Sequence, residues 1–207
     1  MIYSNKIFEV AYPSKGISPS LFSFLDDSGC NLVDIFGVSK LAEIEKIRIF
    51  ILRKALFERE RDLHFRKNAT PDCVAFSSWR IVVESYNDLK KCYSDIAYCK
   101  LVLHECIHVL QRFTTKVPAC DAVWLYEAVA CYLAGQEKVV PLRNIRDIEW
   151  DSLKYAFYDV KDCYAIAYKL GKEFFTQFGT ATALKMCADP ELCEKYFQQY
   201  IDKLEDK

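Results

Sequence analysis

The chain has 207 residues, of which 52% are hydrophobic and 28% are charged. This balance is that of a globular protein, and it excludes a disordered or collagen-like chain. The formal net charge of -1 gives no electrostatic reason to expect nucleic acid or a membrane surface as a partner. Glycine and proline, with six residues each, are scarce, which favours a helix-rich fold over one of many short strands.

Ten cysteines are many and three histidines are few for this length. No Cys-x-x-Cys pair occurs, so a zinc ribbon or a thioredoxin-like redox site is not indicated. The first residues lack the basic and apolar regions of a signal peptide, and no apolar run is long enough to span a membrane. We therefore expect a cytoplasmic protein whose cysteines are reduced thiols packed as small apolar side chains.

The first half of the chain predicts a mixed α/β lobe. Several Gly and Pro breakers predict irregular structure over residues 1–40. The alternating pattern of 47–52 predicts a half-buried strand, and the mixed charges of 53–67 predict a solvated helix. The pattern of 73–83 is that of one bent strand or two short paired ones, and 86–93 is typical of a short helix.

Helical periodicity dominates from Asp95 onward. Apolar residues at steps of three and four predict a helix that runs to about Phe113. Pro118 ends this region, and Asp121 is a plausible N-cap for a second helix that runs to Leu133. Further helices are predicted at 148–159, 162–178, 180–188 and 190–205.

These elements predict an α+β fold. We expect a single domain over 1–207, made of an α/β lobe with a short β-sheet (1–115) and an all-helical lobe (116–207).

The first predicted long helix carries His104-Glu105-Cys106-Ile107-His108, a His-Glu-x-x-His motif that is typical of zinc metallopeptidases. Histidines at i and i+4 share one helical face, so both imidazoles can reach one zinc ion. Glu105 borders this face, where its carboxylate can act on a water at the metal without binding the metal. Cys106 points away from the face and is expected in the core. The alternative is a chance match on an amphipathic helix.

A catalytic zinc usually takes three protein ligands and leaves a fourth position for water. The remaining histidine, His64, lies in the charged helix, where a side chain without a function is expected. Glu127 is the candidate third ligand, because it interrupts an otherwise apolar helix in which an unpaired carboxylate would be costly. The alternative places Glu127 on the solvent side of that helix.

His104-Glu105-x-x-His108 together with Trp124-Leu125-x-Glu127-x-x-Ala130 resembles the gluzincin metallopeptidases, most closely their aminopeptidase N-like branch. The resemblance covers about 98–135. It implies a minimal thermolysin-like (zincin) core, one zinc ion bound by His104, His108 and Glu127, and Glu105 as the general base.

Weaker similarities lie on either side of this core. Ala75, Phe76 and Ser77 resemble the edge strand that binds an extended peptide substrate in such enzymes. Tyr168, three residues before Gly171, resembles the tyrosine whose hydroxyl stabilises the oxyanion, and Tyr164 one turn earlier is the alternative. The Gly-x-Met-Glu-Asn segment of those aminopeptidases is absent, so endo- and exopeptidase activity both stay open.

The sequence thus predicts a zinc metallopeptidase that acts on a peptide or protein substrate, with no nucleic-acid or membrane partner. One rival is a non-catalytic, zinc-stabilised module of the same fold that binds a peptide or a protein. The intact Glu105 argues against it, because a structural zinc site has no use for a general base. A third possibility is a helical interaction domain without metal. The sequence leaves the oligomeric state open.

Overall fold

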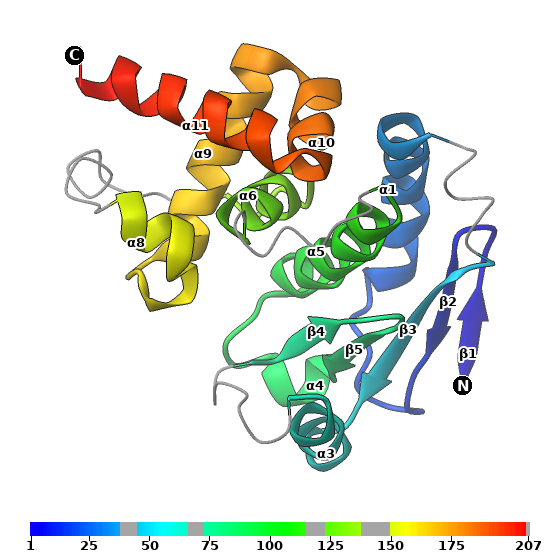
Figure 1. Cartoon of the computed structure of the whole chain (residues 1–207). Helices are drawn as coiled ribbons and strands as arrows, with labels where there is room; N and C mark the ends of the chain where they lie inside the picture. The colour runs from blue at the N-terminus through cyan, green and yellow to red at the C-terminus, as the bar shows by residue number, and fades with distance from the viewer. Residues whose placement is uncertain (38–44, 66–72, 115–122, 138–149, 206–207) are drawn as a thin grey trace. The chain divides into compact units, whose positions relative to one another are not determined.

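A computed structural model gives the fold (Figure 1). The structure describes residues 1–37, 45–65, 73–114, 123–137 and 150–205. The chain forms two compact units, Met1–Leu110 and Gln111–Lys207. The boundary lies five residues before the predicted one, inside helix α5 (Asp95–Thr114). Pro118 and Asp121, the predicted end of one helix and N-cap of the next, lie outside the described residues.

The first unit contains a five-stranded mixed sheet with the strand order β1-β2-β3-β5-β4. The central strands β2, β3 and β5 are parallel, and the outer strands β1 and β4 are antiparallel to their neighbours. The strands are β1 (Ile2–Ser4), β2 (Phe8–Ala11), β3 (Ile47–Leu52), β4 (Ala75–Ser77) and β5 (Ile81–Glu84). The strand predicted at 47–52 is confirmed, and the segment 73–83 resolves into two short paired strands.

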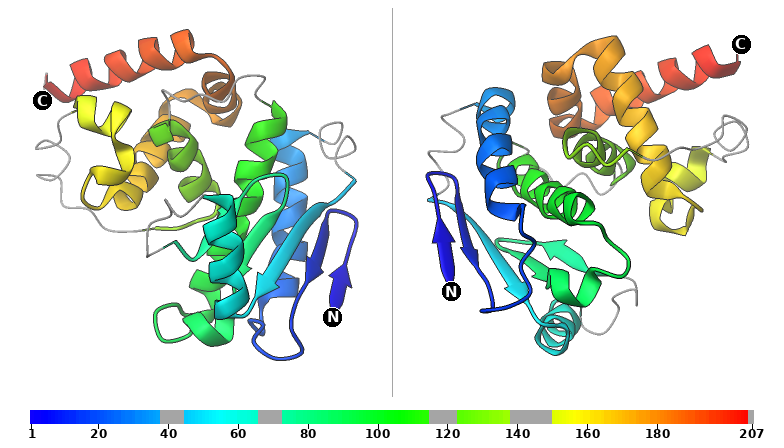
Figure 2. Two further views of the ribbon diagram at one scale, coloured as in Figure 1. Left: turned by 60° about the horizontal axis from the view of Figure 1, so that its bottom comes forward. Right: turned by 180° about the vertical axis from the view of Figure 1, so that it is seen from behind.

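Helices lie on both faces of this sheet. α1 (Leu21–Phe36) and the first part of α5 lie on one face, and α3 (Lys54–His64) lies on the other (Figure 2). A short helix, α4 (Tyr86–Leu89), precedes α5. Burial follows from this layering: every second residue of β3 is buried, whereas all four residues of β5 are. A strand covered on both faces reads as a continuous apolar run.

The predicted irregular structure of residues 1–40 is wrong, because this segment forms β1, β2 and α1. The buried residues of α1 include Leu21, Leu25 and Leu32, which follow a helical period that the breakers obscured. Gly29 is one of these breakers, but it lies inside the helix. A Cβ there would lie 2.8 Å from Cδ1 of Ile7, so glycine allows α1 to pack closely against the start of β2.

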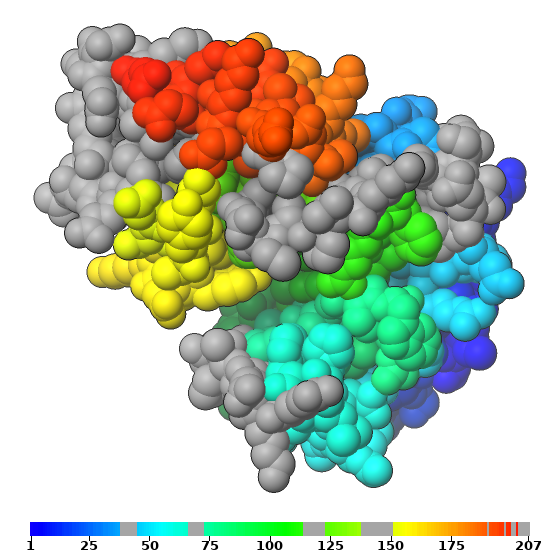
Figure 3. Space-filling view, in the orientation of Figure 1, coloured from blue at the N-terminus to red at the C-terminus, as the bar shows by residue number. Residues whose placement is uncertain are grey.

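The second unit consists of helices in its described part. They are α6 (Val123–Leu133), α8 (Trp150–Tyr155), the 3-10 helix η1 (Phe157–Asp159), α9 (Cys163–Phe178), α10 (Thr180–Ala188) and α11 (Pro190–Glu205). The predicted helices at 162–178, 180–188 and 190–205 are confirmed to within one residue. α11 lies on the surface of this unit, as α3 does on the first (Figure 3). The α+β class is therefore correct.

α6 is apolar on nearly all sides, which is typical of a helix at the centre of a helical unit. It packs against α9, and the closest approach is at Gly171. A Cβ on Gly171 would lie 2.3 Å from the backbone oxygen of Ala128. Only a glycine therefore allows α9 to lie this close to the α6 turn that follows Glu127.

The described cysteines are free thiols, and most are buried, as expected. The buried ones are Cys99, Cys106, Cys131, Cys163, Cys187 and Cys193. Cys106 is fully buried, in agreement with its predicted place in the core. Among the described residues, no helix has both the length and the apolar character that a membrane span requires.

We predict that Gly171→Ala destabilises the protein by about 1–3 kcal/mol, because the added methyl group forces α6 and α9 apart. This cost exceeds the gain in helix propensity that alanine brings at an unconstrained site. The measurement is the free energy of unfolding in urea. Gln177→Ala, an exposed position on the same helix, is the control and should change stability by less than about 0.5 kcal/mol. Equal stability of the two variants would contradict the close packing of α6 and α9.

Candidate metal centre

Helix α5, which carries the two motif histidines, is anchored near its N-terminus. The carboxylate of Asp95 accepts hydrogen bonds from the hydroxyl groups of Ser18 and Ser20. One turn later, the hydroxyl of the fully buried Tyr98 donates to the backbone oxygen of Glu84, at the end of β5, over 2.9 Å. These bonds fix the helix on the sheet, so that the positions of His104 and His108 follow from the helical repeat.

His104 and His108 lie one turn apart on the same face of α5, as predicted. Their Nε2 atoms are 2.9 Å apart, and their rings are nearly perpendicular at 86°. His104 is buried and His108 is partly buried. Two imidazole nitrogens can lie this close when one donates a proton to the other or when both face a cation. The 2.9 Å separation is that of a hydrogen bond between the two rings, in which the tautomers decide the donor.

The third histidine, His64, lies at the end of α3 and is exposed. Its ring stacks on Phe76 at a centroid distance of 4.7 Å and meets Phe65 edge-on. These contacts give His64 a packing role, in line with the expectation that it has no place in the site.

Glu105 is buried, with 8% of its surface exposed, and it lies within electrostatic reach of Cys73, just before β4. Burial raises the pKa of the Cys73 thiol, and the negative charge of Glu105 raises it further, whereas Arg61 lowers it. The candidate base and the start of β4 are therefore neighbours within the first unit.

β4 consists of the three residues predicted to bind substrate, Ala75, Phe76 and Ser77. It is the last strand in the sheet order, and its register pairs Phe76 with Val82 of β5. Phe76 is buried in a cluster with Phe57 and Val82, whereas Ala75 and Ser77 are half-buried. An extended peptide can add to an outer strand of a sheet by backbone hydrogen bonds. Peptide binding at this edge stays a prediction.

Glu127 is buried on α6, with only 5% of its surface exposed. The alternative in which it faces solvent is therefore wrong. Its Oε1 atom accepts a hydrogen bond of 2.9 Å from the hydroxyl group of Tyr158, which lies in η1. An ionised carboxylate is stable away from water only when it is hydrogen-bonded or binds a cation.

A second set of hydrogen bonds fixes α6 next to Glu127. The side-chain amide of Gln111 donates to the backbone oxygen of Tyr126 over 3.1 Å, and the hydroxyl of Tyr126 donates to the backbone oxygen of Cys187 over 2.9 Å. Burial raises the pKa of the Cys187 thiol, which a hydrogen bond from Gln111 partly offsets. Fully buried Gln111 thus connects the last turn of α5 with α6 and α10.

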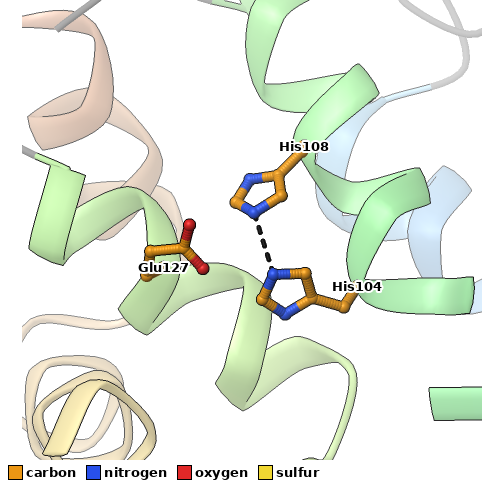
Figure 4. Close-up of side chains that lie close together, drawn as sticks. All are labelled: His104, His108 and Glu127. Carbon is orange, nitrogen blue, oxygen red and sulfur yellow. Dashed lines mark hydrogen bonds between the residues drawn. The ribbon is translucent and has the colours of Figure 1, made fainter. Parts of the chain in front are cut away.

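The ligand atoms of His104, His108 and Glu127 all lie within 4.8 Å of one another. Figure 4 shows the two imidazole rings and the carboxylate turned toward one another. This group of two imidazoles and one carboxylate could hold a metal ion.

The two candidate tyrosines of α9 have different surroundings. Tyr164 is exposed, and its ring centroid lies 6.4 Å from that of Tyr158. Tyr168 is half-buried and lies 6.1 Å from Tyr132, and burial, assisted by the charge of Glu137, raises its pKa. Of the two, Tyr164 is therefore the one beside the tyrosine that contacts Glu127.

Sequence reasoning missed Gln111 and did not select Tyr158. Gln111 is a polar residue in an apolar stripe, three positions after His108, and this pattern could have indicated a buried role. Tyr158 is one of four tyrosines between residues 155 and 168, and no sequence pattern distinguishes it from the others. Its contact with Glu127 spans 31 positions, which no local pattern predicts.

Comparison with known proteins found no matching family model, curated protein or solved structure. The resemblance to gluzincins therefore stays a prediction from the motif residues.

We predict that Gln111→Ala lowers the free energy of unfolding by about 1–3 kcal/mol, the usual effect of losing a buried hydrogen-bonding group. Chemical denaturation measures the change. Arg112→Ala, at the exposed neighbouring position of the same turn, should stay within about 0.5 kcal/mol of the wild type. If the two substitutions cost the same, Gln111 does not have the anchoring role described above.

Proposed function

We propose that this protein is a zinc-dependent metallopeptidase, built on a minimal thermolysin-like core. The observation that carries the proposal is the mutual approach of His104, His108 and Glu127 to within 4.8 Å, with Glu105 beside the first histidine on the same helix.

The donor set fits a catalytic zinc ion. Two imidazoles and one carboxylate are a known ligand set of catalytic zinc, and they leave a fourth position for water or substrate. Ligands about 2.0–2.1 Å from a tetrahedral ion lie roughly 3.3 Å apart. The 2.9 Å separation of the histidine nitrogens and the 4.8 Å limit for the group bracket this value. The chemistry of the three donor side chains therefore supports zinc as the bound ion.

When bound, zinc would act as a Lewis acid that polarises the scissile carbonyl and lowers the pKa of a bound water molecule to about 7. The carboxylate of Glu105 would accept a proton from a water molecule as the water oxygen adds to the carbonyl carbon. As the C–N bond breaks, Glu105 returns the proton to the leaving amine nitrogen. The hydroxyl of Tyr164 or Tyr168 would donate to the developing oxyanion.

The outer strand β4 supports a peptide as the substrate. Its three residues present a sheet edge, and Cys73 just before it lies within the electrostatic reach of Glu105. A peptide added to this edge by backbone hydrogen bonds would pass close to the general base.

The metal site predicts that purified wild-type protein binds about one zinc ion per chain. His104→Ala, His108→Ala and Glu127→Gln should each weaken zinc binding by roughly 100-fold or more, because loss of a ligand costs more than loss of an outer partner. Chelator competition measures the affinity, and circular dichroism checks the fold. His64→Ala is the matched control, because it removes the one histidine outside the site. If all four variants bind zinc as the wild type does, the ligand assignment is wrong.

The catalytic role predicts that Glu105→Gln keeps zinc but lowers kcat by about 100- to 10,000-fold, the usual contribution of a general base. Mass spectrometry of new peptide ends in a diverse peptide library measures cleavage. Glu191→Gln, at an exposed position on α11, should keep the wild-type rate.

The same experiments separate the alternatives. Wild-type protein that binds zinc but cleaves nothing in the library would indicate the non-catalytic, zinc-stabilised binding module. Absence of stoichiometric metal would instead indicate a helical interaction domain. Cleavage by Glu105→Gln at the wild-type rate would refute the mechanism while leaving the metal site intact.

A further inference from the structure

Tyr158 contacts the candidate ligand Glu127 from a distant part of the chain. Its hydroxyl donates to Oε1 of Glu127 over 2.9 Å, and both residues lie within the second unit. Tyr158 is exposed, whereas Glu127 is buried. The tyrosine thus extends from the surface of this unit to a carboxylate that solvent barely reaches.

A compact local structure holds Tyr158 in place. Its neighbour Phe157 is buried, with 3% of its surface exposed, and anchors the short helix η1. The Phe157 ring meets those of Tyr158 and Tyr164 edge-on, at centroid distances of 5.2 and 5.9 Å. Asp162 then adopts a left-handed conformation, with φ at 59°, and α9 begins directly after it. The packing of this turn therefore fixes the position of the Tyr158 hydroxyl group.

We propose that Tyr158 is a positioning residue that fixes the carboxylate of Glu127 for metal binding, an inference that rests on the proposed metal site. A hydrogen bond to one carboxylate oxygen restricts rotation of the group and so sets the direction of the other oxygen. Outer partners of this kind orient metal ligands and typically change metal affinity by 10- to 100-fold. Tyr158 acts through Glu127 and needs no contact with substrate.

A purely structural role makes a different prediction. If the hydrogen bond only stabilises the second unit, its loss lowers stability with and without metal and leaves the zinc affinity of the folded protein unchanged. A positioning role instead lowers the affinity of protein that remains folded. Zinc affinity and the melting temperature of the metal-free protein must therefore be measured together.

The test is Tyr158→Phe, which removes the hydroxyl and keeps the ring. We expect zinc affinity, measured by chelator competition on the full chain under conditions where the metal-free variant is folded, to fall about 10-fold or more. The lost hydrogen bond to a buried carboxylate also lowers the melting temperature of the metal-free protein, so the affinity is compared for the folded protein only. Tyr155→Phe is the matched control, because Tyr155 is also exposed and its ring lies beside Lys154. It should bind zinc as the wild type does.

A double substitution tests whether Tyr158 affects zinc affinity through Glu127. In a Glu127→Gln background, Tyr158→Phe should cause no further loss of zinc affinity, because the oriented carboxylate is already absent. An additive loss would overturn the inference, as would wild-type affinity in Tyr158→Phe, or a loss no larger than the unfolded fraction explains. Failure of the wild-type protein to bind zinc at all would instead refute the proposed function.

Discussion

A carboxylate almost fully removed from water constrains the second unit. Burying an ionised group is costly unless it is hydrogen-bonded or paired with a cation. Glu127 meets this requirement in part through the hydroxyl of Tyr158. The helix around it has no polar face to turn toward solvent, and α9 approaches it closely at Gly171. The packing that buries Glu127 thus also fixes its position, and it favours a cation as a further partner.

The first unit holds His104 and His108 at a fixed spacing on helix α5. Its sheet and α1 provide a rigid platform, and the hydrogen bonds of Asp95 and Tyr98 fix the start of α5 on it. The histidines then need only the helical repeat to share a face. Because Glu105 is one position away from that face, the same repeat brings the candidate base to the edge of the site.

The proposed metal site combines residues from two helices that are separate in the sequence. His104, His108 and Glu127 form a group that could hold a metal ion. Glu127 is buried and accepts a hydrogen bond from Tyr158, which lies 31 positions further along the chain. The support for the proposed function therefore comes from these residues themselves.

The sequence by itself determined the features that depend on local periodicity. The helix of His104 and His108 and the helices predicted at 162–178, 180–188 and 190–205 follow from steps of three and four residues, and the structure confirms them to within one residue. The helix of Glu127 ends at Leu133 as predicted, whereas the segment predicted as one helix at 148–159 contains α8 and the separate 3-10 helix η1. Only the tertiary structure decided the rest. Helix α1 continues through Gly29, because the side chains of Ile7 and Phe8 pack against this position and leave little room for a Cβ atom. The tertiary structure also shows that Tyr158 hydrogen-bonds Glu127 and that Gln111 hydrogen-bonds the backbone of Tyr126. Such bonds between distant segments depend on how the helices pack, so no periodic pattern in the sequence predicts them.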